Sequence, residues 1–318
     1  MFKKITIAAV AVAASVSLAA CGGPNGGAPG ADGNKQKTIG LAVANQQADF
    51  FNQIRQSVEA EAKAENVKVV IADAKGDSNT QVSQIQDFIT QQVDAIIYIP
   101  AGATAATVPV KAAKAANIPI VTVDRNPEGA PGDTFIATDS VKAAKDLGEW
   151  VGKKVDGKGQ LGVIQGQLGT TPEVARDTGF KEAMTQFPGI KEVARQASKQ
   201  WAQDEGFQIA TDMIQANPSI NILFGRADAL ALGAAQAAKN AGLKDVTVVG
   251  FDGDVAGLKA VQSGTLAATI TQPTQAMGKL AVESAVKLTN GEKLPAEQLQ
   301  AGVLTTKDNV APFITTHP

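Results

Sequence analysis

Charged and aromatic residues follow several of the short apolar runs in this sequence. Asp124 and Arg125 come at the end of IPIVTV, and Asp252 follows VVGF. Phe50 and Phe51 come shortly after the apolar run TIGLAVA. Carboxylates accept hydrogen bonds and guanidinium groups donate them, so such residues can hold a polar ligand. An aspartate after a strand is also a common helix N-cap, and for each residue alone this alternative stays open.

The segments that would position these residues alternate between strand and helix patterns. FFNQIRQSVEAEAKAE places Ile54, Val58 and Ala62 on one face of a helix, together with Phe50 or Phe51. DAIIYIP and IPIVTVD are apolar throughout, which is typical of parallel strands covered by helices on both faces. The pattern predicts a doubly wound α/β class, in which ligands bind beyond the carboxyl ends of the strands. The expected strands are residues 38–44, 67–72, 95–100, 118–124, 134–138, 160–165, 192–196, 220–224, 246–251 and 266–270.

The first residues have the features of a bacterial export signal that ends at a lipid attachment site. Lys3 and Lys4 precede an almost wholly apolar run, and the segment LAAC, which resembles a lipobox, ends at Cys21, the only cysteine. An apolar run this short is typical of a cleaved signal rather than a membrane span. We therefore expect a signal peptide at residues 1–20, acylation of Cys21, and a flexible Gly- and Pro-rich tether over residues 21–37. This predicts an exported lipoprotein anchored on the periplasmic or extracellular face of a membrane.

Composition excludes several classes of function. The chain carries 29 Lys and Arg against 31 Asp and Glu, a formal net charge of -2, whereas a nucleic-acid partner would favour a basic stripe. One histidine, His317, and one cysteine leave almost no room for a zinc site or a His-dependent triad. The sequence contains no G-x-G-x-x-G, Walker A or G-x-S-x-G motif. We therefore expect no cofactor, no metal and no enzymatic activity.

A set of motifs spread along the chain resembles the ribose-binding proteins and their relatives among the sugar-binding proteins of ABC importers. These motifs are TIGLAVANQQADFF, IPIVTVDRN, ARDTGF, DALALGAAQA, VTVVGFDG and LAATITQP. The resemblance implies the type I periplasmic-binding-protein fold, with two doubly wound parallel-sheet domains joined by a three-segment hinge. LacI-type repressors share this fold, but they carry a helix-turn-helix where this chain has its export signal.

The resemblance also implies an organisation and a mode of action. It places an N-terminal lobe at residues 38–138 and 272–302 and a C-terminal lobe at 139–271 and 303–318. The lobes are expected to close around a small sugar or polyol, and the loaded, monomeric protein to meet the permease of an ABC importer. A ligand-presenting role for a chemoreceptor or a sensor kinase, including sensing of autoinducer-type sugars, is the alternative.

The ligand contacts of the family, carried over residue by residue, fall on aromatic and charged positions. The flat rings would pack on the C–H faces of a sugar, while the charged groups would bond its hydroxyls. Core packing is the alternative for the rings, and ion pairing between the lobes is the alternative for the charges. The positions implied as ligand contacts are Phe50, Phe51, Asp124, Arg125, Arg176, Trp201, Asp252 and Gln272.

Two positions depart from the ribose pattern. Amides of the family fall here on Ala48 and Ala227, so ribose loses two hydrogen-bonding partners. Asp49 and Arg226, their neighbours, are further candidates for ligand contact, and Arg226 facing the cleft would favour a sugar acid. Arg226 as a solvated surface charge outside the cleft is the alternative.

Overall fold

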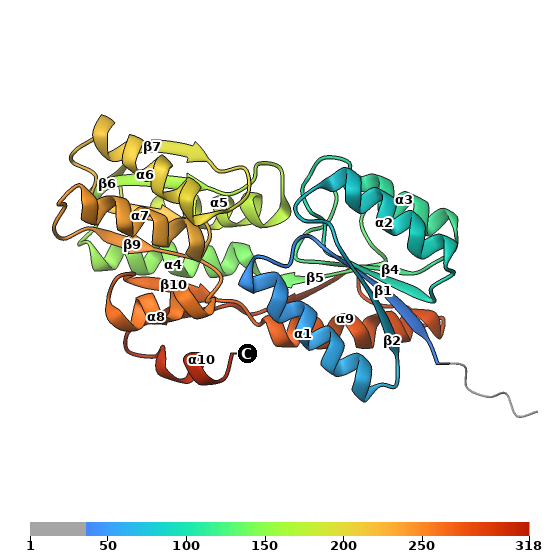
Figure 1. Cartoon of the computed structure of the whole chain (residues 1–318). Coiled ribbons are helices and arrows are strands. Elements are labelled where there is room, and N and C mark those ends of the chain that lie inside the picture. Colours follow the sequence, from blue (N-terminus) through green and yellow to red (C-terminus); the bar gives the residue numbers. More distant parts are fainter. Residues whose placement is uncertain (1–35, 318) are drawn as a thin grey trace, which may run out of the picture. The chain divides into compact units, whose positions relative to one another are not determined.

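The computed structural model describes residues 36–317 (Figure 1). The predicted signal peptide, Cys21 and residues 21–35 of the predicted tether lie outside the described residues. Among the helices of residues 36–317, none is both long enough and apolar enough to cross a membrane.

The first of two sheets has six strands, and all neighbouring strands in it are parallel. Its strand order is β11-β5-β4-β3-β1-β2. Leu41 and Ala42 of β1 point to opposite faces, as alternate residues of a strand must. Leu41 packs with the helices α1 (Asp49–Ala64) and α9 (Thr274–Thr289), and Ala42 packs with α2 (Ser78–Thr90) and α3 (Thr107–Ala115). The strands are β1 (Thr38–Val43), β2 (Lys68–Asp73), β3 (Ala95–Tyr98), β4 (Ile120–Val123), β5 (Thr134–Thr138) and β11 (Glu297–Gln300).

The second sheet repeats this architecture with one antiparallel edge. Its strand order is β12-β10-β9-β8-β6-β7, and only the β10–β12 pair of this sheet runs antiparallel. α4 (Ser140–Lys154) and α5 (Thr171–Met184) cover one face, while α6 (Gln203–Ala216), α7 (Asp228–Asn240) and α8 (Val255–Ser263) cover the other. The short α10 (Ala311–Thr315) packs beside α8. The strands are β6 (Lys158–Gln165), β7 (Gly189–Ala197), β8 (Ile222–Gly225), β9 (Thr247–Val249), β10 (Ala268–Thr271) and β12 (Val303–Thr306).

The two sheets with their helices are called here the first lobe and the second lobe. The chain passes from one to the other after β5, after β10, and between β11 and β12 (Figure 1). The predicted fold class, two doubly wound parallel-sheet domains, is confirmed. The strand pattern located β1 to β10 within a few residues but missed β11 and β12, whose sequences EQLQ and VLTT form short edge strands.

Candidate functional site

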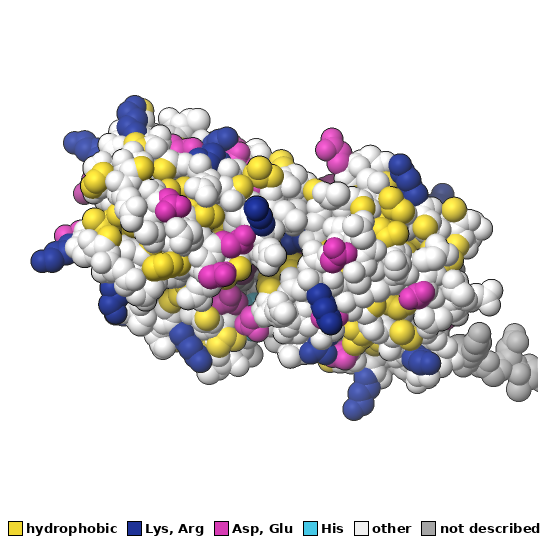
Figure 2. Space-filling model, turned by 45° about the horizontal axis from the view of Figure 1, so that its top comes forward, with side chains coloured by type: hydrophobic (Ala, Val, Ile, Leu, Met, Phe, Trp, Pro, Cys, Tyr) yellow, Lys and Arg dark blue, Asp and Glu magenta, His cyan; other side chains and the backbone are white. Residues whose placement is uncertain are grey.

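A cleft of about 410 Å³ lies between the lobes and takes residues from both. Its size suits a small molecule, since ligand pockets usually measure roughly 300–1,000 Å³. Figure 2 shows acidic and basic side chains along the hollow between the two lobes. The cleft-lining residues include almost all of those implied by the resemblance, namely Phe50, Phe51, Asp124, Arg125, Arg176, Trp201 and Asp252.

The first-lobe wall joins two phenylalanines to an aspartate–arginine pair. Phe50 and Phe51, at the start of α1, belong to the hydrophobic core and also line the cleft, with ring centroids 5.3 Å apart. The guanidinium of Arg125 lies over the Phe51 ring at 5.3 Å from its centroid. Its Nη1 donates to the carbonyl oxygens of Pro100 and Ala101 at 3.0 and 2.8 Å. Arg125 is thus fixed to the end of β3 before any ligand binds.

Asp124 stands beside Arg125 in a backbone conformation that is rare for an L-residue. Its φ is 62°, and its carboxylate Oδ2 lies 3.4 Å from Nε of Arg125. Burial raises the pKa of Asp124, against the attraction of Arg125 and Arg176. Left-handed backbone of this kind costs about 1–3 kcal/mol and tends to mark functional sites.

The second-lobe wall mirrors this arrangement with Arg176, Trp201 and Asp252. Arg176 is 3% exposed, and its guanidinium lies 3.9 Å from the Phe251 centroid and 5.5 Å from that of Trp201. Its Nη2 lies 3.2 Å from Oδ1 of Asp252. Trp201 (φ 60°) and Asp252 (φ 132°) also have positive φ values, so each wall carries strained residues.

Burial raises the pKa of Asp252 to about 7, an effect that Arg176 opposes and that Asp254 and Asp124 reinforce. Asp254 also lines the cleft, and burial raises its pKa as well. Near neutral pH, Asp252 can therefore either accept hydrogen bonds as a carboxylate or donate one as an acid.

Asp228 holds the loop that carries Asp252 and Asp254 through hydrogen bonds to its backbone. This fully buried carboxylate accepts from the backbone N–H groups of Gly253 and Asp254 at 2.8 and 3.1 Å, and from the hydroxyl of Thr269 at 2.6 Å. Asp228 thereby fixes the position of both acidic residues of this loop.

Gln272 lies next to the cleft without being part of its wall. It is 1% exposed, and its Nε2 donates to Oδ1 of Asp252 over 2.7 Å. Gln272 lies where the chain passes from β10 to α9. The residue predicted to contact the ligand therefore bonds a carboxylate that lines the cleft and does not line the cleft itself.

The positions that depart from the ribose pattern, Ala48 and Ala227, both line the cleft, and so does Asp49. Oδ2 of Asp49 accepts from Nε2 of Gln53 at 3.0 Å and from the backbone N–H of Val255, across the lobes, at 3.2 Å.

Arg226 does not line the cleft, nor is it a solvated surface charge. It is fully buried, and its guanidinium pairs with Glu173 at 3.0 Å and with Asp177 at 2.5 Å, both on α5. The candidate ligand contact at Arg226 is therefore wrong, because two carboxylates of its own lobe turn the side chain away from the cleft.

Several cleft residues were not identified from the sequence, although the same strand-end rule applied to every strand would have found them. Asn45, Lys75, Gln167 and Lys199 follow β1, β2, β6 and β7 respectively. The Oδ1 atom of Asn45 accepts from the N–H groups of Gln47 and Ala48, which shapes the loop before the phenylalanine pair.

Direct contacts also join the lobes through residues that do not line the cleft. The Thr171 hydroxyl accepts from the N–H of Asn126 at 2.8 Å and lies 3.1 Å from the carbonyl oxygen of the same residue. His317 places Nε2 2.6 Å from the Gly253 carbonyl oxygen and Nδ1 3.1 Å from the Thr274 hydroxyl at the start of α9. Within residues 36–317, no cluster of three or more His, Cys, Asp or Glu side chains could hold a metal ion.

Comparison with known proteins identifies relatives over nearly the whole described chain. Residues 39–293 match the model of the periplasmic binding protein domain. The chain is 32% identical over 272 residues to the ribose import binding protein of Bacillus subtilis, covering 85% of this chain and 88% of that protein. It is 32% identical over 310 residues to the xylitol-binding protein of Mycolicibacterium smegmatis, covering 96% and 86%. A solute-binding protein of an ABC transporter from Bacillus halodurans, solved with bound myo-inositol, has a TM-score of 0.82 at 28% identity, covering 88% and 97%.

Proposed function

Because this chain belongs to the family of periplasmic binding proteins, we propose that it captures a small neutral sugar or polyol in the cleft and delivers it to the permease of an ABC importer. One observation carries the proposal. Each lobe presents a guanidinium group beside a carboxylate and over an aromatic ring: Arg125 with Asp124 and Phe51, and Arg176 with Asp252 and Trp201.

This arrangement fits the surface of a polyhydroxylated ring. Carboxylates accept from vicinal hydroxyls, while guanidinium groups donate to ring and hydroxyl oxygens. Charge-assisted hydrogen bonds of this kind contribute about 1.5–3 kcal/mol each.

Ligand capture works by closure of the two lobes, which meet at the crossovers near residues 138–139, 271–272 and 301–304. A ligand that bonds Arg125 on one lobe and Arg176 on the other stabilises the closed form, because only differential affinity can shift such an equilibrium. The lobe boundaries of this proposal are residues 38–138 with 272–302, and residues 139–271 with 303–318.

The side chains at three positions narrow the class of ligand. The methyl groups of Ala48 and Ala227 leave ligand hydroxyls without partners at these positions, at a cost of about 1–3 kcal/mol each if buried. Because Arg226 points away from the cleft, it cannot pair with a ligand carboxylate, and the argument for a sugar acid as the ligand no longer applies. D-ribose, xylitol and myo-inositol, the ligands named for relatives, are the first compounds to test.

Export and anchoring complete the proposal. Signal cleavage before Cys21, acylation of its thiol and a tether to residue 37 would keep a monomeric receptor at the membrane beside the permease. Fatty-acid labelling of the parent and of Cys21→Ala tests this step, since label that persists on the variant contradicts it.

The binding proposal is tested by a thermal-shift screen of pentoses, hexoses, polyols, sugar acids, nucleosides and amino acids, followed by calorimetry of each hit. A ligand specific for the folded state at a hundred times its Kd stabilises the protein by about 2.7 kcal/mol. We expect stoichiometric binding of a neutral sugar or polyol without turnover. Binding of nucleosides or amino acids alone would overturn the proposal. Loss of chemotaxis rather than sugar uptake on gene deletion would favour the sensory role.

A further inference from the structure

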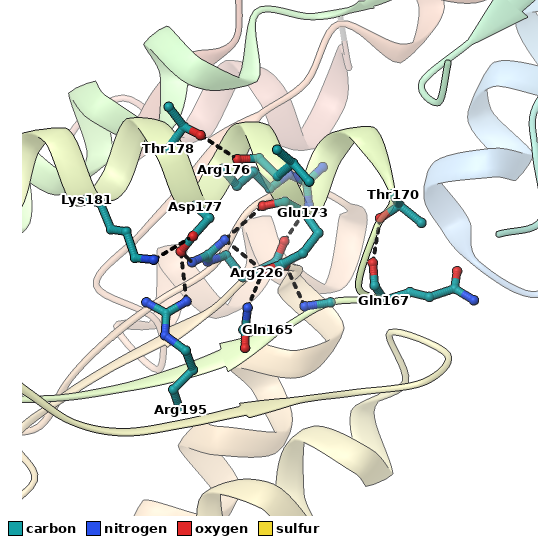
Figure 3. A network of polar contacts seen from close by, with 12 residues as sticks. Gln165, Gln167, Thr170, Glu173, Arg176, Asp177, Thr178, Lys181, Arg195 and Arg226 are labelled. Carbon is teal, nitrogen blue, oxygen red and sulfur yellow. Dashed lines mark hydrogen bonds and ion pairs between the residues drawn. The ribbon is translucent and has the colours of Figure 1, made fainter. Parts of the chain in front are cut away.

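A buried ion-pair network lies directly behind the second-lobe wall of the cleft (Figure 3). Arg226 follows β8, and its Nη1 donates to Oε1 and to the backbone carbonyl oxygen of Glu173, both at 3.0 Å. Its Nη2 donates to Oδ1 of Asp177 over 2.5 Å. Glu173 and Asp177 stand four residues apart on α5, so their carboxylates lie on the same side of that helix. Arg226 therefore ties α5 to the end of β8.

The network reaches the cleft first through Arg176. The backbone carbonyl oxygen of Arg226 accepts a hydrogen bond from Nη1 of Arg176, whose Nη2 faces Asp252. Arg226 thus holds α5 with its side chain, and its backbone carbonyl also holds the guanidinium of Arg176 in the cleft wall.

The second connection runs through Glu173 to Trp201. Oε2 of Glu173 accepts from the N–H of Gly166 over 2.7 Å, and Oε1 accepts from Nε2 of Gln165 over 2.9 Å. The indole of Trp201 packs directly on Gly166, since a Cβ atom there would come within 1.9 Å of the ring. The surface under the Trp201 ring is therefore held by the carboxylate that pairs with Arg226.

Among residues 36–317, Arg226 is the only cationic side chain that forms an ion pair with Glu173. Burial lowers the pKa of Arg226, while Glu173 and Asp177 oppose that effect. Burial raises the pKa of Asp177, but hydrogen bonds from Lys181, Arg226 and Arg195 outweigh it and hold the pKa well below its usual range. Removing Arg226 would leave Glu173 buried beside its two remaining neutral donors, which favours a rearrangement of the first turn of α5.

All these groups belong to the second lobe, so opening of the hinge leaves the network intact. We propose that Arg226 is a positioning residue for ligand recognition, which holds Arg176 and the Gly166 surface under Trp201 in their binding geometry before the ligand arrives. This inference depends on the proposed function in one respect, namely that the ligand is a small sugar or polyol.

The test uses the fluorescence of Trp201 in the ligand-free protein. Since Trp150 is the only other tryptophan, Trp150→Phe leaves Trp201 as the single reporter. Arg226→Gln is compared with Arg195→Gln, which also removes a guanidinium from Asp177. Arg195 forms no hydrogen bond or ion pair with Glu173 or Arg176. We expect Arg226→Gln to change acrylamide quenching and near-UV circular dichroism of Trp201, and Arg195→Gln to leave both at parent values.

Affinity gives the second readout, with D-ribose, xylitol and myo-inositol as probes at a temperature well below each variant's Tm. For the probe that binds the parent most tightly, we expect Arg226→Gln to weaken binding roughly tenfold and Arg195→Gln to leave it unchanged. Arg226→Lys should recover only part of the loss, because one ammonium cannot bond both carboxylates as the guanidinium fork does. If Arg226→Gln does not fold, Glu173→Gln replaces it, with the same Trp201 signature expected.

The two proposals fail in different ways. If no probe binds the parent, the proposed function is contradicted, and the Trp201 signature still tests the positioning role. A stable Arg226→Gln variant with parental Trp201 fluorescence and parental affinity would show that the network serves stability alone and would overturn the inference.

Discussion

Gln272 donates from Nε2 to Oδ1 of Asp252 over 2.7 Å, so an amide on a segment that joins the lobes fixes a carboxylate in the cleft. The same oxygen of Asp252 lies 3.2 Å from Arg176. Asp252 is therefore oriented by one donor at a crossover and one donor in the second lobe.

Gln272→Ala removes the first of these donors, and we expect ligand affinity to fall by about 1–2 kcal/mol, on the order of tenfold. Gln272→Glu should be more damaging, because it removes the donor and adds a negative charge beside a buried carboxylate. Calorimetry with the ligand found in the screen checks this order. Parental affinity for Gln272→Glu together with weaker binding by Gln272→Ala would mean that Gln272 acts only by filling space.

Arg176→Ala should weaken ligand binding by roughly 2–4 kcal/mol, on the order of a hundredfold. The variant leaves both Asp252 and the ligand oxygens without their charged donor in a buried cleft. Arg55→Ala, which removes a surface arginine paired with Glu59 on α1, is the matched control and should bind like the parent. Unchanged affinity for Arg176→Ala would reduce Arg176 to a structural contact.

Asp252→Asn should raise stability at pH 8 more than at pH 4. The pKa of Asp252 is about 7 in the folded protein, against 3.8 as the ordinary value. Because the unfolded chain loses this proton first, the group destabilises the fold progressively between these values, and the penalty is absent below about pH 4. The asparagine keeps Oδ1 as an acceptor but never ionises. Thermal unfolding of both proteins at the two pH values measures the difference, and a gain that is equal or larger at pH 4 contradicts it.

Thr171→Val removes the hydroxyl that contacts Asn126 across the lobes while keeping the shape of the side chain. Since these contacts form only when the lobes meet, we expect a loss of about 1 kcal/mol in ligand affinity. Thr178→Val on the same helix removes a hydroxyl that bonds only the carbonyl of Val174, and it should bind like the parent. Small-angle scattering of the ligand-free proteins checks whether the average opening has increased in Thr171→Val.

The sequence predicted the fold class and the strand-end location of the site because apolar runs and their periodicity are local properties. The same pattern missed β11, whose EQLQ sequence is polar and exists as a strand only because β5 offers a free edge. Such an edge strand depends on a partner more than a hundred residues away, which no local pattern records.

The error at Arg226 has a comparable origin. Its position after β8 is that of a cleft residue, and only its partners on α5 turn it inward. The spacing of Glu173 and Asp177, one helical turn apart, was visible in TPEVARD, but the helix face they share acquires meaning only once α5 is packed beside β8. Gln272 lies between β10 and α9, and whether it touches a ligand or only a carboxylate depends on side-chain positions that the sequence does not contain.

The late position of β11 and β12 affects how this chain folds. Each supplies the last edge strand of a different sheet, so neither lobe is complete until residues 297–306 are present. Pairing between strands that are far apart in the sequence slows folding. Before β11 and β12 have paired, the edges of β5 and β10 are exposed and can pair with strands of other chains. A chain cut after α9 would lose an edge strand from each sheet, so the C-terminal segment is needed to complete both sheets.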